Sequence, residues 1–501
     1  MPPELTDLRL YSTTWVRERV TYTRDAIAGI FGLPPSAQEE ADKIMGDLVY
    51  KGILKKCSKT GEQQSGVEQN NPLELFIGKG DYAFSYVGIY CYKGHLVYAL
   101  PKYEQQHELH TPEPLQGSTT DTARLEALAQ LMQVIHRYES QNTENLDNLQ
   151  QENENEHYLA QLVSLVTDYV ENGEYRDDEQ RDALNENGRI LWDRTINSIQ
   201  PHIQKGRPVY TDMYTRRLVD AEDHFISKLH RVIVKECERQ LEIFGLLELL
   251  ELPVVETIED DVEELGETEY LIHCIDNELG CQFDSRRVHV LKSMKAYLEN
   301  RRQRDDEAQE EYYFGSSSFH TVWEEACREV FGKDERKDHQ IAPPTWKFMA
   351  NKALQGPADS LEPDIIIKRP DAYWLFDAKY YLPRISGNSV SGLPGVSDVT
   401  KQFLYQQALQ KQEGAAIPPI HNAFLIPLPS NSSEQVQAPA SPITLFAQVS
   451  MPLFSTLPDI NTFFIHPQSL YNAYLHPEQR AMLQNEMVAC INATPSACQA
   501  N

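Results

Sequence analysis

Two aspartates and a lysine at the end of two apolar segments are the residues best suited to chemistry. Residues 365–367 are β-branched and residues 373–376 are mostly aromatic, and the Arg-Pro-Asp between them is typical of a turn, so a β-hairpin is predicted. Asp364 and Asp377 are equally far from the centre of this turn, so they lie opposite each other, with Cβ atoms ~4.5–5.5 Å apart. Two carboxylates at that separation suit a hard divalent cation such as Mg²⁺. Lys379 follows two residues later and points to the same face.

The same residues have a simpler interpretation. Asp377 and Lys379 would form an ion pair at a strand end, and Asp364 would cap the preceding turn. The hairpin is apolar on both faces, as expected of central strands covered by helices. Such a strand has little other reason to end in Asp-Ala-Lys, which favours a reactive site. Glu362 lies opposite Lys379 in this register, but Pro363 interrupts pairing there, so Glu362 is interpreted as a local salt-bridge partner.

Composition indicates a globular, soluble protein. The 501 residues suggest two to four domains at about 150 residues each, with 41% hydrophobic and 24% charged residues. The net charge of −29 argues against a chain that wraps nucleic acid by itself, since phosphate binding needs clustered Lys and Arg. Most of the acidity precedes residue 311, so the N-terminal part suits a protein partner better than DNA.

Cysteine usage and hydropathy bear on the compartment. The eight cysteines are scattered, with no Cys-x-x-Cys pair, as is typical of reduced thiols in a cytoplasm. A zinc site using His273, Cys274 and Cys281 is conceivable. No basic-then-apolar leader begins the chain, and no apolar run approaches about 18 residues. We therefore expect a cytoplasmic protein with no membrane contact.

Residues 1–115 are predicted to form a winged-helix-like and β-hairpin docking region, separable from the rest. Residues 1–57 are predicted to be helical, with a capping box of Ser36 and Glu39 opening the second helix and residues 51–54 leading into a wing strand. The exposed face of that helix is acidic and would be repelled by phosphates, so a structural or protein-docking role is favoured over DNA reading. Its core-facing stripe is predicted to be Ala41, Ile44, Met45, Leu48 and Val49.

Residues 82–92 and 95–100 are predicted to be strands joined by a two-residue turn. Their tyrosines are either a stacking platform for bases or ordinary aromatics on the surface of a sheet. Residues 116–310 are predicted to be a mainly helical, acidic middle region, with 256–269 as an acidic loop and 140–157 as a solvated connection or exposed helix. The strongest predicted helices are 125–138 and 225–250, and the predicted turn is Lys93-Gly94.

Residues 311–501 are predicted to be an α/β unit within an α+β chain. A helix with an apolar stripe carries Glu324 on its flank and precedes the hairpin, and Asp398 is predicted to N-cap the helix that follows. These elements suggest a mixed sheet covered by helices on both faces. Further strands are predicted at 423–426, 444–449 and 462–465, and the stripe consists of Val322, Trp323, Ala326, Cys327, Val330 and Phe331.

Three sequence blocks carry a family resemblance. Pro363-Asp364, twelve intervening residues and Asp377-Ala378-Lys379 match the PD-(D/E)xK nuclease motif. Together with the flanking blocks, the motif resembles the LlaJI-type restriction endonucleases, which are similar to McrC, the nuclease subunit of GTP-dependent McrBC systems. The resemblance covers about residues 312–410, and residues 84–103 resemble the family more loosely. The blocks are Ser318-Phe-His-Thr-Val-Trp-Glu-Glu-Ala-Cys327, Phe376-Asp-Ala-Lys-Tyr-Tyr381 and Pro394-Gly-Val-Ser-Asp-Val-Thr-Lys-Gln402.

The resemblance implies a restriction-endonuclease-like fold and a role for each matching residue. Asp364 and Asp377 would hold Mg²⁺ or Mn²⁺, and Glu324 would add a third carboxylate. Lys379 would orient or activate the attacking water and stabilise charge on the phosphate.

A helix motif of some relatives is matched less closely. The substrate-binding candidates on this helix are Lys401, Gln402 and Tyr405. Gln402 and Tyr405 resemble a Gln-x-x-x-Tyr motif, but the spacing here is one residue shorter. An ordinary polar helix residue is the alternative for Gln402.

The chain has no Gly-x-x-x-x-Gly-Lys-Ser/Thr sequence, so any nucleotide-driven motor would be another polypeptide. The resemblance implies an AAA+ McrB-like GTPase in trans, with this chain as the DNA endonuclease of a restriction system for phage defence. Two alternatives remain. One is an adaptor or activator of an AAA+ NTPase with an incidental nuclease fold, and the other is a standalone nuclease.

Overall fold

The chain folds into two compact units, residues 1–152 with 310–501 and residues 153–309. The sequence predicts three regions with a boundary at 310. The structure divides the chain after residues 152 and 309 and places the segments before and after the second unit together in one unit. None of the helices described is long and apolar enough to cross a membrane. The computed structural model describes residues 12–34, 36–57, 81–92, 95–104, 119–143, 158–175, 180–186, 189–218, 224–243, 246–249, 252, 254, 261–307, 311–332, 341, 363–386, 389–414, 417–429, 441–452 and 458–493.

Some predictions fall outside these residues. They concern Glu362, the Lys93-Gly94 turn, residues 144–157 of the solvated connection and residues 256–260 of the acidic loop.

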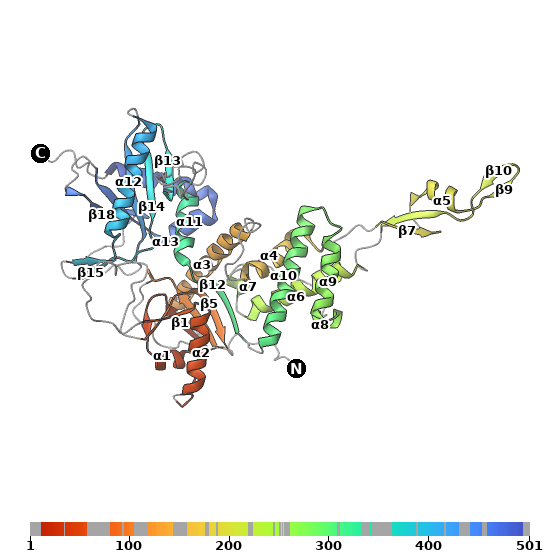
Figure 1. Ribbon diagram of the computed structural model, residues 1–501, viewed down its shortest axis with the longest axis horizontal. Helices are drawn as coiled ribbons and strands as arrows, with labels where there is room; N and C mark the ends of the chain where they lie inside the picture. Colours follow the sequence, from red (N-terminus) through yellow and green to blue (C-terminus); the bar gives the residue numbers. More distant parts are fainter. Residues whose placement is uncertain are drawn as a thin grey trace, which may run out of the picture. The chain divides into compact units, whose positions relative to one another are not determined.

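The first unit combines elements from both ends of the chain (Figure 1). Its N-terminal elements are β1 (Ser12–Arg17), β2 (Thr21–Tyr22), α1 (Arg24–Ile30), α2 (Gln38–Tyr50), β3 (Leu54–Lys56), β4 (Tyr82–Phe84), β5 (Val87–Tyr92), β6 (His95–Leu100) and α3 (Thr119–Thr143). Its C-terminal elements are β12 (Glu311–Ser316), α11 (Phe319–Phe331), β13 (Ile365–Lys368), β14 (Tyr373–Ala378), β15 (Arg384–Ser386), β16 (Ser389–Ser391), α12 (Val396–Glu413), β17 (Ile420–Pro427), β18 (Ile443–Val449), β19 (Ile460–Ile465), α13 (Pro467–Leu475) and α14 (Arg480–Ala493).

One sheet joins the two ends of the chain in the order β1-β6-β5-β12. The antiparallel β5–β6 pair places Tyr92 opposite His95. β12 pairs with the other edge of β5, and β1 runs parallel to β6. The prediction that residues 1–57 are helical is therefore wrong for residues 12–22. Ser-Thr-Thr-Trp-Val-Arg is rich in β-branched and aromatic residues, which favour strands. Residues 1–115 were predicted to be separable from the rest of the chain. Their removal would leave β12 without its partner β5.

α1 and α2 pack beside a small antiparallel sheet in the order β2-β4-β3, and β3 is the predicted wing strand. The stripe on α2 is buried as predicted except for Val49, which is 38% exposed. The predicted capping box is wrong. α2 begins one residue later than that box requires, with Ala37 at the N-cap and no side-chain cap bond.

The tyrosines of this region form neither an open stacking platform nor a sheet surface. The predicted strand 82–92 is two strands, β4 and β5, that belong to different sheets. Tyr86, Tyr90 and Tyr98 are buried in the core. Tyr82 and Tyr92 are only partly buried and pack against the same cluster.

The C-terminal region contains the predicted mixed sheet, in the order β13-β14-β17-β19-β18. β14, β17 and β19 are parallel, and β13 and β18 add antiparallel edges. α11 covers the face that carries Phe376, since the Phe331 and Phe376 rings meet edge to face at 6.3 Å. α12 covers the opposite face, where its Tyr405 packs against Leu375. Helices thus cover both faces of the hairpin, as predicted (Figure 1).

The second unit is mainly helical, as predicted, but it also contains strands. Its helices are α4 (Tyr158–Asn172), α5 (Trp192–Ser198), α6 (Phe225–Ile243), α7 (Leu246–Leu249), α8 (Val262–Leu265), α9 (Thr268–Leu279) and α10 (Ser285–Glu307). Its strands are β7 (Gln180–Leu184), β8 (Arg189–Ile190), β9 (His202–Gln204), β10 (Arg207–Val209) and β11 (Tyr214–Leu218).

The sequence analysis predicts no strands between residues 180 and 218, although Lys205-Gly206 is a recognisable turn sequence. The sheets are β7-β11-β8 and β10-β9. Lys205 and Gly206 both have positive φ, 51° and 77°, the conformation that a two-residue hairpin turn requires. The acidic loop prediction is also wrong in part, because residues 262–265 form α8 and α9 begins at Thr268.

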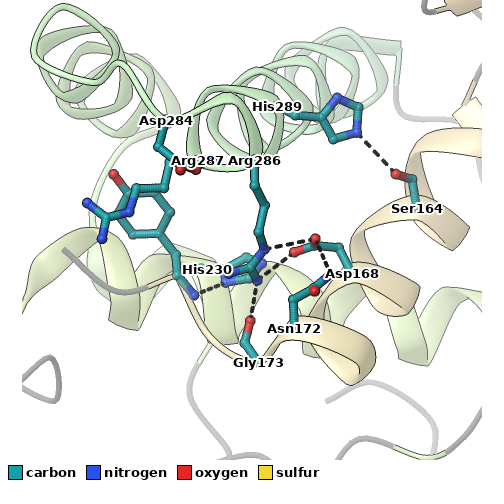
Figure 2. A network of polar contacts seen from close by, with 10 residues as sticks. Ser164, Asp168, Asn172, Gly173, His230, Asp284, Arg286, Arg287 and His289 are labelled. Carbon is teal, nitrogen blue, oxygen red and sulfur yellow. Dashed lines mark hydrogen bonds and ion pairs between the residues drawn. The ribbon is translucent and has the colours of Figure 1, made fainter.

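A polar network holds α4, α6 and α10 of the second unit together (Figure 2). Arg286 on α10 makes two hydrogen bonds to Asp168, of 3.0 and 2.9 Å, and a third of 2.7 Å to the Gly173 carbonyl. His230 Nδ1 accepts from the Tyr175 amide at 2.9 Å, and burial lowers the pKa of His230 to about 4. A neutral His230 acts here as a fixed acceptor.

The joint between β5 and β12 yields a stability prediction. Gly88 and Gly315 face each other with φ of 146° and 156°, and a methyl group on Gly88 would lie 2.1 Å from the Phe314 carbonyl oxygen. We expect Gly88→Ala to lower the free energy of unfolding by about 1–3 kcal/mol, through backbone strain and overpacking. Urea unfolding followed by circular dichroism measures this.

Gly46→Ala is the matched control. Gly46 is exposed within α2, and a methyl group there would meet nothing within 4 Å. Because alanine favours a helix interior, this change is expected to be neutral or to stabilise by about 0.5–1 kcal/mol. Equal stabilities for Gly88→Ala and Gly46→Ala would contradict the close approach at the joint.

Candidate active site

The predicted hairpin register is confirmed. β13 and β14 pair antiparallel with Ile365 opposite Phe376, and the same register places Asp364 opposite Asp377. The Ala378 amide donates a hydrogen bond of 3.0 Å to Asp364 Oδ2. This bond fixes the Asp364 carboxylate against the end of β14.

The position of β13 in the sheet differs from the prediction. It is an edge strand, because β17 pairs with the other side of β14. Ile365, Ile366 and Ile367 are nevertheless buried, since α11 and α12 cover the two faces of the hairpin. A fully apolar edge strand looks the same in sequence as a central one.

Lys379 lies in contact with the carboxylate pair. Its Nζ is 2.7 Å from Asp377 Oδ2, and the Lys379 amide donates to the Leu425 carbonyl at 2.8 Å, which continues the β14–β17 pairing. Burial lowers the pKa of Lys379, but the Asp377 carboxylate more than offsets this, so the pKa is raised overall. Lys379 is therefore a protonated, positively charged group at neutral pH.

Asp377 is 4% exposed. Burial, and then the charge of Asp364, raise the pKa of Asp377 to about 7, although Lys379 opposes the shift. Glu324, on the predicted flank of α11, behaves in the same way. Burial and then Asp364 raise the pKa of Glu324 to about 7, with Lys379 again opposing. Glu324, Asp364, Asp377 and Lys379 thus form one electrostatically coupled group.

α12 places its three predicted residues differently. Lys401 is exposed and influences Asp377 electrostatically, with its Nζ 5.4 Å from the centre of the Tyr405 ring. Tyr405 is 1% exposed and lies in the core beside Leu375. Gln402, also 1% exposed, donates to the Leu375 carbonyl at 3.3 Å, so its side chain serves the sheet here. A DNA contact by Gln402 or Tyr405 stays a prediction.

Asp398 links α12 to the site, but not as the predicted N-cap. Gly395 is the N-cap residue, and Asp398 three positions later accepts from the Gly395 amide at 3.1 Å. The second role of Asp398 was missed, because it also accepts from the Tyr381 hydroxyl at 3.0 Å. Tyr381 and Asp398 lie in two of the sequence blocks that resemble the family, but the spacing of these blocks does not indicate a hydrogen bond between the two side chains.

The carboxylates fit a divalent cation by their chemistry. Raised pKa values at Asp377 and Glu324 reflect negative charges that a buried cation would stabilise. Within the described ranges, however, no three His, Cys, Asp or Glu side chains are already gathered as a metal centre. Lys379 instead holds Asp377 at ion-pair distance. The same finding gives no support to a zinc site at His273, Cys274 and Cys281.

Comparison with known proteins identifies the family. The family model of the LlaJI restriction endonuclease matches residues 86–446. The chain belongs to the LlaJI restriction endonuclease family. It is also 26% identical over 412 residues to a component of the Bacillus subtilis type II restriction enzyme BsuMI, named YdjA. This alignment covers 79% of the chain and 81% of the relative. The family predicted from the sequence blocks is confirmed.

Two solved assemblies from Thermococcus gammatolerans are also similar. One is a half-complex of McrB AAA+ hexamers with bound McrC, with a TM-score of 0.43, 11% identity and coverage of 95% of this chain and 99% of that chain. The other is a McrBC complex, with a TM-score of 0.21, 15% identity and coverage of 57% and 79%. Both scores are low, so the fold description rests on the strands and helices of this chain.

The raised carboxyl pKa values predict a pH-dependent stability. The folded protein holds protons on Asp377 and Glu324 between their ordinary pKa values of 3.8 and 4.5 and the raised values of about 7. Stability from these groups is therefore present at low pH and is lost as pH rises through about 7. We expect Asp377→Asn to flatten this part of the profile in urea unfolding with EDTA.

Asp371→Asn is the control, since Asp371 is an exposed carboxylate at the turn of the same hairpin. Its profile should follow that of the wild type. An Asp377→Asn profile parallel to the wild type would show that Asp377 ionises normally.

Proposed function

We propose that this LlaJI-family chain is a metal-dependent DNA endonuclease subunit and that Asp364, Asp377, Lys379 and Glu324 form its active site. The observation that carries the proposal is the opposed pair Asp364 and Asp377, with Lys379 Nζ 2.7 Å from Asp377, in a restriction endonuclease family. Opposed carboxylates beside a lysine suit hydrolysis of a phosphodiester, in which negative charge grows on the phosphate oxygens.

Asp364 and Asp377 would hold Mg²⁺ or Mn²⁺, and Glu324 would reach the same ion from α11. When bound, such an ion clamps the phosphate and lowers the pKa of its bound water. Coordination would require Asp377 to share its carboxylate between the ion and Lys379. The hydrogen bond from the Ala378 amide keeps Asp364 in place for this role.

Lys379 would act as a cation and hydrogen-bond donor. Its raised pKa keeps the ammonium charged, so it is suited to orienting the attacking water and stabilising charge on the phosphate. Taking a proton from water would require a neutral amine, which the adjacent Asp377 disfavours. Lys401 on α12 adds positive charge near Asp377 for a neighbouring phosphate.

Substitutions test the site directly. Asp364→Asn, Asp377→Asn and Lys379→Met should each lower DNA cleavage in Mg²⁺ by about 10³-fold or more, because each removes stabilisation of the transition state. The wild-type and variant rates are compared on the same DNA, with circular dichroism confirming the fold.

Lys368→Met is the matched control. Lys368 lies at the opposite end of β13 and pairs with Glu413 at 3.1 Å, so its loss should leave the cleavage rate within about threefold. Cleavage by Asp377→Asn near the wild-type rate would falsify the site.

We further propose that an AAA+ GTPase partner delivers DNA to this chain. The support is the McrC-like motif resemblance, the absence of a P-loop from the sequence and the net charge of −29, which weakens DNA binding by the chain alone. The acidic exposed face of α2 suits a partner with basic residues. One of its carboxylates, Asp42, is already paired with Arg24 at 2.6 Å.

Reconstitution tests this dependence. The purified chain alone should cleave duplex DNA poorly at physiological salt, and a P-loop GTPase encoded beside it should restore cleavage with GTP. The same partner with its P-loop lysine replaced should not restore cleavage. Efficient cutting by the single chain would favour a standalone nuclease, and no cutting with the intact partner and GTP would favour an adaptor.

A further inference from the structure

A buried lysine lies directly behind the candidate active site. Lys102 follows β6, is 3% exposed, and has its Nζ 4.2 Å above the ring centre of Tyr380, the residue after Lys379. The Lys102 amide donates to the Tyr380 hydroxyl at 3.2 Å. Among the described residues, the Lys102 ammonium has no ion pair or hydrogen bond, and the ring of Tyr380 is its contact.

An ammonium in this position is costly to the folded protein. A cation removed from water needs a paired anion, and one aromatic ring replaces only part of its hydration. Burial lowers the pKa of Lys102 to about 8, even though Glu18 opposes the shift. The fully buried nitrogen atoms without a hydrogen-bond partner do not include Lys102 Nζ. The small exposed part of the Lys102 side chain therefore includes its ammonium group.

Lys102 belongs to a group of cations that outnumbers the nearby carboxylates. Arg19 and Arg384 both lower the pKa of Lys102, after burial and against Glu18. Burial lowers the pKa of Arg17, and Arg384 lowers it further. The Nε atom of Arg17 is buried without a hydrogen-bond partner in the described structure.

Glu18, the carboxylate that opposes the lowering of the Lys102 pKa, is engaged in other contacts. Glu18 accepts a hydrogen bond of 2.7 Å from the Tyr380 hydroxyl and lies 3.6 Å from Arg19. Arg17 donates a hydrogen bond of 3.0 Å to the Glu104 backbone carbonyl, and the Glu104 charge opposes the lowering of the Arg17 pKa by burial. Glu18 therefore does not pair with Lys102, and the Lys102 charge remains available for an anion from outside the chain.

α11 runs past both the cation group around Lys102 and the carboxylates of the candidate active site. His320 and Glu324 are four residues apart on α11, so they lie on the same face, separated by about one turn or ~5.4 Å. His320 interacts electrostatically with Glu18 and Lys102, whereas Glu324 interacts with Asp364 and Lys379. Lys102 and Arg19 therefore lie near a position on α11 that is one helical turn from the position beside the active-site carboxylates. Successive phosphates of a DNA strand advance by ~3.4 Å along the duplex axis, so a neighbouring phosphate falls within this range.

We propose that Lys102, with Arg17 and Arg384, is an anion site that binds a backbone phosphate of DNA next to the phosphate being cleaved. The inference rests on the proposed nuclease function and adds to it a subsite supplied by the N-terminal region. Strands β1 and β6 would then position substrate in addition to completing the fold. A lysine that only fills space over Tyr380 is the competing explanation.

DNA binding in EDTA tests the subsite without cleavage. Lys102→Met in the full-length chain should weaken binding of a short duplex about tenfold at low salt, measured by fluorescence anisotropy. The slope of log K against log salt should fall by about 1, because one phosphate contact is lost. The melting temperature should stay the same or rise, because an uncompensated buried cation is removed.

Three further variants make the result specific. Arg384→Gln alters a half-buried cation on β15 and should repeat the loss of affinity if Lys102→Met does not fold. Lys368→Met removes the same charge from a lysine already paired with Glu413 and should leave the salt slope unchanged. Tyr380→Phe keeps the ring beneath Lys102, removes its bonds to Glu18 and the Lys102 amide, and should retain DNA affinity.

The outcomes separate the explanations. Unchanged affinity and salt slope with a lower melting temperature for Lys102→Met would overturn the proposal in favour of a packing role. Inorganic phosphate that stabilises the wild type but not Lys102→Met, with equal DNA affinity for both, would overturn the DNA assignment and indicate a free-anion site. Because binding is measured without metal, a failure of cleavage by the wild type would count against the nuclease proposal alone.

Discussion

The repulsion between carboxylates at the end of the β13–β14 hairpin is the constraint on which the first unit depends. Asp377 is 4% exposed and lies opposite the half-buried Asp364, so the Asp377 charge is poorly solvated. Lys379 compensates part of this charge at 2.7 Å, and the Ala378 amide holds Asp364. The covering helices then add the carboxylate of Glu324 and the positive charges of Arg328 and Lys401. This uncompensated repulsion suits the cation and the phosphate that we propose for the site.

Local patterns were sufficient to predict the β13–β14 hairpin. Its register follows from symmetry about one turn, and the apolar stripe of α11 follows from helical spacing, so both could be placed without knowledge of the rest of the chain. The three later strands were found because each is a short apolar run between polar segments. The family followed from the same blocks and is confirmed by the match over residues 86–446.

Long-range pairing could not be predicted in this way. Sequence alone does not distinguish the buried edge strand β13 from a central one, and it gives no sign that Tyr380 bonds to Glu18, 362 residues away. The resemblance to a Gln-x-x-x-Tyr motif assigns Gln402 to substrate binding, whereas in the structure its amide donates a hydrogen bond to the Leu375 carbonyl. The β-strands of residues 180–218 were missed for a different reason, since Lys205-Gly206 was a readable turn signal.

The sheet that joins both ends of the chain also sets an order of events during synthesis. β5 leaves the ribosome more than two hundred residues before β12, so its outer edge has no partner until the second unit has been made. An unpaired strand edge is a template for association with other chains. The helical insertion therefore imposes a delay during which a chaperone, or a neighbouring nascent chain, can reach β5. Codon usage across residues 153–309 would set the length of that interval.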